Sequence, residues 1–211
     1  MRIDVFSIFP NLIETFAGES ILGRTIDRGL LELNCHDIRL GAKDSHQSVD
    51  DAPFGGGAGM VLKPEPIFET VEQVKPQRPI FLLSPTGPVF DQAKAIELSE
   101  LGGFSLLCGR YEGVDQRVKD HLIDEELSVG NFVLSGGEIA ALLVIESVTR
   151  LLPGAMGNSE SSEEESFSNG LLEYPHYTRP WNFRKYTPPE ILRSGDHEQI
   201  RQWRKAMSLK A

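Results

Sequence analysis

The sequence predicts an α/β fold in which helices cover both faces of a parallel β-sheet. Short runs of strand-forming residues alternate along the chain with segments whose apolar residues recur at helical spacing. This alternation is typical of parallel sheets, whose strands are joined by crossover helices. The chain has 211 residues, enough for one domain with a full core and a small second one, and the alternation stops at Gly154.

Prolines and glycines support the limits of the expected helices. Pro10 stands at the first position of the first helix, where its fixed φ angle is favourable. A long apolar helix is stopped by Pro153 and Gly154. The expected elements are a strand over 2–6, helices over 10–16 and 19–31, a strand over 33–40, a long polar loop from Gly41 to Gly59, a helix over 64–74, a strand over 79–83, a helix over 91–101, a strand over 104–108, a short helix over 114–122, the segments 126–130 and 131–134, and the long helix over 136–152.

The composition of the chain changes after Gly154. Residues 155–170 are rich in Ser, Glu, Gly and Asn, which is linker composition. Beyond them the pattern indicates two short helices, over 188–195 and 196–207, with Asp196 as the N-cap of the second. We therefore expect a main domain over 1–154, a flexible linker over 155–170 and a small helical domain over 171–211.

Targeting signals and a disulfide framework are absent from the sequence. No apolar run approaches the roughly 20 residues that span a bilayer, and the first residues lack the pattern of a secretory signal. The two cysteines, Cys35 and Cys108, lie far apart in apolar strand-like runs, which predicts buried, reduced thiols. We therefore expect a cytoplasmic protein that does not bind membranes.

The net charge of −10 is unevenly distributed along the chain. Residues 1–170 contain 13 Lys and Arg against 27 Asp and Glu, whereas residues 171–211 contain 8 against 4. A basic tail behind an acidic body suits a polyanion such as RNA as the partner of the tail. Imbalances of this size also occur in proteins without such a partner, so the charge favours RNA binding only weakly.

Three loops that contain glycine follow expected strands or precede the long helix. They are SPTGP (84–88), GRYEG (109–113) and SVGNFVLSGGE (128–138). In parallel α/β proteins ligands bind at the carboxyl ends of the strands, and glycine lets the backbone approach a ligand closely. One such loop alone is more simply a tight turn or a helix entry. Three at one sheet edge favour a shared site for a flat, polar ligand such as adenosine.

A fourth loop, VDDAPFGGGAGM (49–60), has glycine at four of its last six positions. Such a segment is costly to order unless a ligand or close packing holds it. It matches neither the P-loop, because no Gly-Lys-Ser/Thr follows, nor the dinucleotide-binding fingerprint. The composition therefore favours a loop that closes over a planar base or a backbone, rather than one that binds phosphate.

Five motifs occur in a characteristic order: DDAPFGGGAGM, LLSPTGP, CGRYEGVDQR, SVGNFVLSGGE and PHYTRP. Together they closely resemble the bacterial tRNA (guanine-N1)-methyltransferases, which modify the guanosine at tRNA position 37, beside the anticodon. The resemblance extends from MRIDVFSIFP to IRQWRK, nearly the whole chain, and only the combination is specific. It implies a SPOUT fold with a C-terminal trefoil knot in the main domain, and a homodimer whose active sites are shared between chains. It also implies S-adenosylmethionine as methyl donor and a requirement for Mg²⁺, whose site the sequence does not reveal.

The resemblance places the methyl donor at the strand exits, in the segments 82–87, 109–112 and 129–137. The backbone of Leu134 and Gly136 is expected to meet the adenine, with Tyr111 and Glu112 close by. Phe132 and Ala140 stand where the family more often has tyrosine and proline, which matters little if backbone contacts dominate. The implied donor-binding residues are Leu82, Leu83, Ser84, Pro85, Gly87, Gly109, Tyr111, Glu112, Val129, Gly130, Phe132, Leu134, Gly136, Gly137 and Ala140.

Two residues are expected to carry the chemistry. Arg150 matches the family's essential arginine, which stabilises the negative charge that spreads towards O6 of guanine. The family's general base is an aspartate in an acid–Ser–aromatic triplet, and this chain has Glu165, followed by Ser166 and Phe167. Glu165 is therefore the expected proton acceptor, with Glu112 a further candidate participant. From the residues alone, Glu165 is also one of three solvated acids, and Arg150 also complements a helix C-terminus.

The resemblance also indicates residues that contact the RNA. Gly59 and its neighbours are expected to cover the target guanine. Asp50 and His46 adjoin this loop and either touch RNA or serve as turn and surface residues. Further expected RNA contacts are Ser166, His176 and Arg179. Basic side chains of the tail are expected to meet phosphates of the anticodon stem. They are Arg179, Arg184, Lys185, Arg201, Arg204 and Lys205.

Three other functions remain open at the level of sequence. The chain could methylate a different RNA nucleotide, although the glycine loop and PHYTRP argue against it. It could be a catalytically impaired protein that binds S-adenosylmethionine and RNA, because the family's aspartate is missing. It could also be a nucleotide-sensing α/β module with no RNA partner. Mapping of a methylated base and RNA binding at two salt concentrations separate these alternatives.

Overall fold

The structure is a computed structural model that describes residues 1–156, 166–167 and 171–209. It contains two compact units, Met1–Gly157 and Asn158–Ala211. Within the described ranges, no helix is long and apolar enough to cross a membrane. Most of the expected linker, 155–170, lies outside the described residues, so the proposed domain limits stay predictions.

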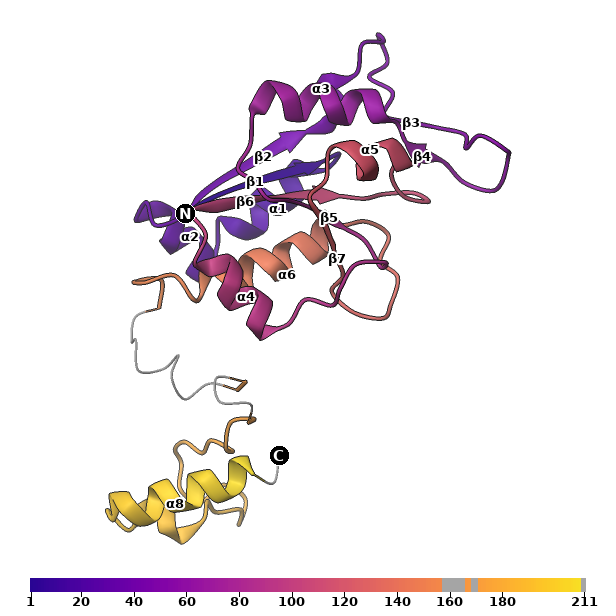
Figure 1. Cartoon of the computed structure of the whole chain (residues 1–211). Coiled ribbons are helices and arrows are strands. Elements are labelled where there is room, and N and C mark those ends of the chain that lie inside the picture. The colour runs from indigo at the N-terminus through magenta and orange to yellow at the C-terminus, as the bar shows by residue number, and fades with distance from the viewer. Residues whose placement is uncertain (157–165, 168–170, 210–211) are drawn as a thin grey trace. The chain divides into compact units, whose positions relative to one another are not determined.

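The first unit is built around a five-stranded parallel sheet (Figure 1). Each neighbouring pair of strands runs in parallel, so the carboxyl ends of all five lie at one edge. The parallel α/β sheet expected from the sequence is therefore confirmed. In spatial order the strands are β2 (Glu32–Asp37), β1 (Arg2–Ser7), β6 (Gly103–Cys108), β5 (Ile80–Leu83) and β7 (Glu125–Leu127).

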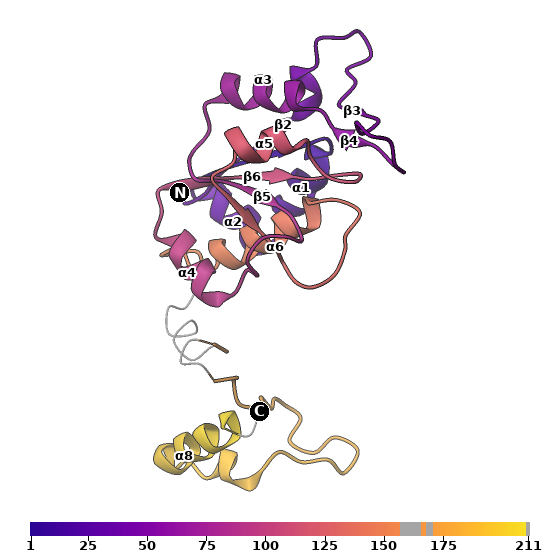
Figure 2. The ribbon, with the colours of Figure 1, turned by 45° about the vertical axis from the view of Figure 1, so that its right-hand side comes forward.

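Helices cover both faces of the sheet, as Figures 1 and 2 show. Successive side chains of a strand point to opposite faces, so Leu106 and Leu107 of β6 enter two different hydrophobic clusters. The cluster of Leu106 packs under four helices, and that of Leu107 packs under two. The four are α1 (Pro10–Ala17), α2 (Ser20–Asp27), α4 (Gln92–Ser99) and α6 (Glu138–Thr149), and the two are α3 (Pro64–Val74) and α5 (Gln116–His121).

Local structure departs from the sequence-based expectation at the end of β2 and in the long polar loop. The strand expected over 33–40 ends at Asp37, because Ile38–Gly41 forms a 3-10 helix, η1, and the Asp37 carboxylate accepts a hydrogen bond from the N–H of Arg39 at 2.9 Å. The loop expected from Gly41 to Gly59 contains a short strand, β3 (Asp50–Asp51), paired antiparallel with β4 (Val61–Leu62). Two-residue strands are too short to show a hydrophobic period, so the sequence did not reveal this pair.

The two cysteine thiols are free, and they differ in burial. Cys108 is buried in β6, and burial raises the pKa of its thiol well above the ordinary value. Cys35 in β2 is only half-buried, although burial still raises the pKa of its thiol to about 12. The expectation of burial is therefore correct for Cys108 and only partly correct for Cys35.

The second unit has little regular structure. Among its described residues, the helices are the 3-10 turn η2 (Glu190–Arg193), shorter than the helix expected over 188–195, and α8 (His197–Ser208). The expected N-cap is confirmed, because the Asp196 carboxylate accepts hydrogen bonds from the N–H groups of Glu198 and Gln199 at 3.1 and 3.0 Å. None of the unit's described residues is buried. Aromatic contacts, such as Tyr177 with Trp203 at 6.4 Å between ring centroids, hold this part together.

Candidate functional site

A cavity of about 490 Å³ opens at the carboxyl edge of the sheet. Its walls come from the ends of β5, β6 and β7 and the loops that follow them, and residues of α5 and Ala140 of α6 also line it. These three loops meet because the three strands are neighbours in the parallel sheet. The volume falls in the range of small-molecule sites, roughly 300–1,000 Å³.

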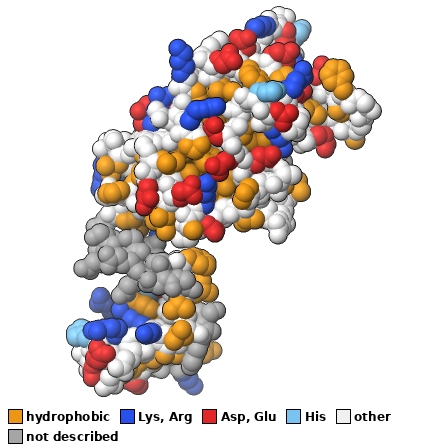
Figure 3. Space-filling model, viewed as in Figure 1, with side chains coloured by type: hydrophobic (Ala, Val, Ile, Leu, Met, Phe, Trp, Pro, Cys, Tyr) orange, Lys and Arg blue, Asp and Glu red, His pale blue; other side chains and the backbone are white. Residues whose placement is uncertain are grey.

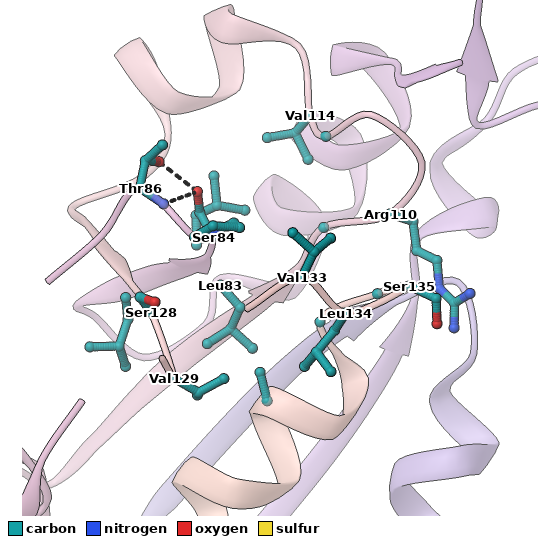
Figure 4. A pocket seen from close by; sticks show the side chains of 18 of the residues that line it. Leu83, Ser84, Thr86, Arg110, Val114, Ser128, Val129, Val133, Leu134 and Ser135 are labelled. Atoms are coloured by element: carbon teal, nitrogen blue, oxygen red, sulfur yellow. Dashed lines mark hydrogen bonds between the residues drawn. The ribbon is translucent and has the colours of Figure 1, made fainter. Parts of the chain in front are cut away.

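The lining of the cavity combines apolar side chains with a few polar groups. Figure 4 shows Leu83, Val129 and Leu134 around the hollow, with Ser84 and Thr86 at one side. The hydroxyl groups of Ser84 and Thr86 lie 2.6 Å apart. Apolar walls with a polar rim suit a flat aromatic ring that carries polar substituents.

The rim next to Thr86 is held by a carboxylate, Glu126. It accepts a hydrogen bond from Thr86 Oγ1 and forms an ion pair with Lys119 at 3.0 Å. Burial acts to raise the pKa of Glu126, but the hydrogen bonds from Thr86, Ser84 and Lys119 outweigh it, so the pKa lies below the ordinary value. Glu126 is therefore ionised at neutral pH, and as a hydrogen-bond acceptor it holds the Thr86 side chain at the rim.

Glycines allow two of the walls to touch through their backbones. The N–H of Gly137 donates to the carbonyl of Gly109 at 2.9 Å, and Gly136 pairs with Arg110 in an antiparallel bridge. A Cβ atom on Gly137 would lie 2.7 Å from Cys108 Cα, closer than real contacts allow. The narrow seam between these loops therefore requires glycine at 137.

The loop after β6 also connects the cavity to the glycine loop. The N–H of Glu112 donates to the carbonyl of Met60 at 2.9 Å, and the N–H of Leu62 donates to the carbonyl of Gly113 at 3.0 Å. Gly59 has a φ angle of +81°, and a side chain there would collide with the Glu112 carboxylate. One five-residue loop therefore fixes the glycine loop beside the cavity.

The comparisons with known proteins agree with this architecture. The family model described as tRNA (guanine-1)-methyltransferase TrmD matches residues 1–211. The chain belongs to this family. Three curated relatives, all named tRNA (guanine-N(1)-)-methyltransferase, come from Dehalococcoides mccartyi, Moorella thermoacetica and Geobacter metallireducens. They are 50%, 49% and 46% identical to this chain, respectively, over 100%, 99% and 99% of it and 86% of each relative. The family resemblance of the five motifs is thereby confirmed.

The residues that the family resemblance assigned to donor binding lie together, with one exception. All of them except Gly87 line the cavity. A Cβ on Gly87 would lie 2.5 Å from backbone atoms of Glu126 and Leu127, so this glycine instead allows close packing against β7. The assignment of the other residues to the donor remains a prediction.

Ten further residues line the cavity, of which Thr86, Arg110, Val133 and Ser135 lie within the segments expected to bind the donor and six were not singled out in the sequence. Each is a chain neighbour of a predicted residue in the same loop or in the adjoining helix, and this adjacency is the signal that would have found them. Arg110 matters most, because its side chain lies at the edge of the cavity and forms a partly buried ion pair with Glu138. The six lining residues outside the expected segments are Gly113, Val114, Gln116, Lys119, Leu127 and Ser128.

The predicted catalytic and target-base residues have different surroundings. Arg150 is the half-buried residue that follows the last turn of α6. Glu165 lies outside the described residues. Asp50 is half-buried in β3, and His46 is exposed, with its N–H donating to Asp44 Oδ1 at 2.9 Å. Asp50 and Gly59 thus flank the glycine loop that the first unit presents beside the cavity.

The remaining predicted RNA contacts lie in the second unit. Ser166 Oγ accepts a hydrogen bond from the N–H of Glu173 at 3.0 Å, and the carboxylate of Glu173 pairs with His176 Nε2 at 2.9 Å. The structure thus brings Ser166 and His176 together through one glutamate. Arg179 lines a separate hollow of about 320 Å³ with Tyr177 and Trp181. Lys and Arg side chains are visible on this unit in Figure 3.

A metal site was expected without a location. Across the parts of the chain that the structure describes, no group of three or more His, Cys, Asp or Glu side chains is arranged to hold a metal ion. The expected Mg²⁺ requirement therefore stays a prediction with no ligands assigned.

Proposed function

We propose that this protein transfers a methyl group from S-adenosylmethionine to N1 of the guanosine at position 37 of tRNA. The observation that carries the proposal is the cavity at the exits of β5, β6 and β7, in a chain whose relatives are tRNA (guanine-N1)-methyltransferases. We place this activity in the cytoplasm, where tRNA is available.

The cavity is suited to an adenosine-bearing donor. Leu82, Val129 and Leu134 supply apolar walls for a purine ring, and Ser84 and Thr86 supply hydroxyl groups at the rim. The glycine seam at Gly136 and Gly137 brings backbone groups close to such a ligand, as recognition through main-chain contacts requires. When bound, S-adenosylmethionine supplies the methyl group on a positively charged sulfur.

The chain's own residues supply proton transfer and charge stabilisation. N1 of guanine keeps its proton at neutral pH, so a base has to remove it, and Glu165 has that role in this proposal. Negative charge then spreads towards O6, where the Arg150 guanidinium stabilises it. Holding both substrates in line supplies much of the remaining acceleration.

The target guanine enters beside the glycine loop. Residues 55–59 adjoin the cavity through the Glu112–Met60 hydrogen bond, so a base held there would lie next to the donor. Asp50 and His46 lie before the glycines on the same loop and contact the RNA in this proposal. Glu112, whose side chain packs against Gly59, stands between the two substrates and is a candidate participant.

The second unit is the proposed binding domain for the anticodon stem. Its basic side chains would neutralise phosphates, which makes binding salt-sensitive. Ser166, His176 and Arg179 are the further contacts. Trp181 and Tyr177 beside Arg179 offer aromatic faces of the kind that RNA-binding proteins use for unpaired bases.

We further infer a homodimer with active sites shared between chains. Leu12 and Phe16 of α1 and Ile139 and Leu143 of α6 are 40%, 53%, 56% and 43% exposed, respectively, on two helices that pack against each other. Exposed apolar groups that gather on adjacent elements mark interaction surfaces. A second copy of the chain would bury them.

The expected trefoil knot belongs to the same proposal. The loop after β7 pairs with the loop after β6 at Gly136 and Arg110, and with the connection after β5 at Ser128 and Val89. The knot itself is proposed from the family resemblance, and these pairings bring together the three loops that it would involve.

Single-turnover methyl transfer tests the function. A tRNA with guanosine at positions 36 and 37 should gain one methyl group at N1 of guanosine 37 in the presence of S-adenosylmethionine and Mg²⁺. A tRNA with adenosine at position 37 is the control and should stay unmodified. Methylation of another nucleotide would indicate a different RNA target, and donor binding without transfer would indicate a catalytically impaired protein. Omission of Mg²⁺ tests the metal requirement.

Glu165→Gln tests the assignment of the base. We expect single-turnover methyl transfer to fall about 10²- to 10⁴-fold, because the amide cannot accept the N1 proton. The affinity for S-adenosylmethionine, measured by titration calorimetry, should stay unchanged. Glu163→Gln, in the same acidic run, is the matched control and should keep its activity. Normal turnover by Glu165→Gln would show that another group is the base.

A further inference from the structure

One carboxylate of the long helix, that of Glu138, is buried. Glu138 is the first residue of α6, and its side chain is 1% exposed. A buried carboxylate is costly unless charged or hydrogen-bonding partners compensate it. The helix N-terminus favours a negative charge, but this effect is worth only about 1 kcal/mol. Glu138 therefore depends on specific partners.

Two of those partners come from distant parts of the chain. Ser7 Oγ, at the end of β1, donates a hydrogen bond to Glu138 Oε1 at 2.7 Å. The Arg110 guanidinium forms an ion pair with Glu138 Oε2, at 3.2 Å from Nη2 and 3.3 Å from Nε. The guanidinium carbon also lies 4.6 Å from the centre of the Phe9 ring, a cation–π contact. The Arg110 side chain is therefore held by two partners, the Glu138 carboxylate and the Phe9 ring.

Arg110 connects this ion pair to the cavity. Its backbone lies in the wall after β6, whereas its side chain lies at the edge of the hollow beside Ser135 (Figure 4). Gly136 of the opposite wall pairs with Arg110, and a Cβ there would collide with Arg110 Nε and Glu138 Oε2. The ion pair therefore fills the space directly behind the seam where the two walls meet.

We propose that the Arg110–Glu138 ion pair is a positioning device that sets the distance between the two cavity walls, 109–112 and 134–137, and thereby the affinity for the methyl donor. This inference rests on the proposed donor site. Glu138 anchors Arg110 to α6, and Arg110 anchors its own loop to the seam. Without the pair, one partly buried charge loses its partner and the loop after β6 relaxes away from Gly136.

The proposal assigns different effects to the two partners of the carboxylate. Arg110 faces the cavity, so its loss should change donor binding. Ser7 contacts the other carboxylate oxygen from β1, so its loss should affect folding stability alone. This contrast distinguishes positioning from a merely structural ion pair.

Donor affinity measured beside thermal stability tests the inference. S-adenosylmethionine is titrated calorimetrically into the full-length protein and into Glu138→Gln, which keeps the shape and the Ser7 contact, and Arg110→Lys, which keeps the charge and loses the planar fork. We expect the Kd to rise about tenfold or more in each, at temperatures well below the Tm. The double variant Arg110→Lys/Glu138→Gln should be little worse than either single one, because the two residues act as one unit.

Ser7→Ala is the matched control. It should lower the Tm and leave the Kd for S-adenosylmethionine within twofold of the unaltered protein. An unchanged Kd in folded Glu138→Gln and Arg110→Lys overturns the inference, and so does an equal rise in Ser7→Ala. Failure of the unaltered protein to bind S-adenosylmethionine instead overturns the donor site, and this inference with it. Arg110→Lys keeps the test available if Glu138→Gln does not fold.

Discussion

At the scale of single residues, Asp4 shows how one buried carboxylate holds several segments together. Its side chain is fully buried in β1, which lies between the edge strand β2 and the central strand β6. It accepts hydrogen bonds from Arg2 Nη2 at 3.0 Å and from the N–H of Gln77 at 3.2 Å, and it contacts His36 Nε2 at 2.9 Å. Burial acts to raise the pKa of Asp4, but the hydrogen bonds from His36 and Arg2 outweigh it and the pKa lies below the ordinary value.

Asp4→Asn should reduce stability in a pH-dependent way. At pH 7 we expect a loss of about 2 kcal/mol in the free energy of unfolding, because hydrogen bonds to a charged group become neutral ones. A carboxylate with a lowered pKa in the folded state stabilises above its unfolded pKa, about 3.9, and loses this contribution as the pH falls through its folded pKa. The difference between the two proteins should therefore shrink below about pH 4.

Urea unfolding at pH 7 and at pH 3.5 measures this difference. Asp27→Asn, at an exposed position of α2, is the control and should change stability little at either pH. An equal loss at both pH values would mean that the charge of Asp4 contributes nothing and that its shape alone matters.

At the scale of elements, the start of α6 approaches β6 through close backbone contact at Gly137. Gly137 adopts helical angles, φ −77° and ψ −8°, which any residue tolerates. Glycine is therefore needed at 137 for space and not for backbone conformation, because a side chain there would collide with Cys108 Cα of β6. The close approach of α6 to β6 therefore depends on the absence of a side chain at Gly137.

Gly137→Ala should separate α6 from β6 and disturb the cavity between them. We expect a loss of about 1–3 kcal/mol in stability, the usual cost of overpacking, and weaker binding of S-adenosylmethionine. Chemical denaturation and calorimetric titration measure the two effects. Gly102→Ala is the control, since a Cβ there meets nothing within 4 Å. Unchanged donor binding in Gly137→Ala would show that the seam is not part of the donor site.

At the scale of the whole molecule, the proposed dimer face lies on the α1 and α6 side of the first unit. Leu143→Glu places a charge within the exposed apolar group of these two helices. We expect the protein to shift from dimer to monomer, because burial of an unpaired carboxylate is strongly unfavourable. Light scattering coupled to size-exclusion chromatography measures the mass directly.

Leu40→Glu provides the matched control for the dimer. Leu40 is 70% exposed and lies in η1, which packs against α3 on the opposite face of the sheet. This variant should remain dimeric. A monomeric unaltered protein, or dissociation by both variants alike, would contradict the assignment of the α1 and α6 surface.

The sequence alone determined the class of fold and the three loops that meet in the cavity. Strand and helix periods are local properties, so runs such as 79–83 and 104–108 were placed within a residue or two. Glycine-containing strand exits predicted a shared site because parallel strands end at one edge. The combination of motifs predicted the family, which the whole-chain match then showed.

Only the tertiary structure decided which side chains meet across the sheet. Arg110, Glu138 and Ser7 stand in three separate segments, and no local pattern joins them. Gly87 belongs to the LLSPTGP motif and was expected to bind the donor. In the structure it instead packs closely against β7. Sequence periodicity records which face of an element is apolar. It does not record which buried charge finds which partner, because that pairing depends on the order of strands in the sheet.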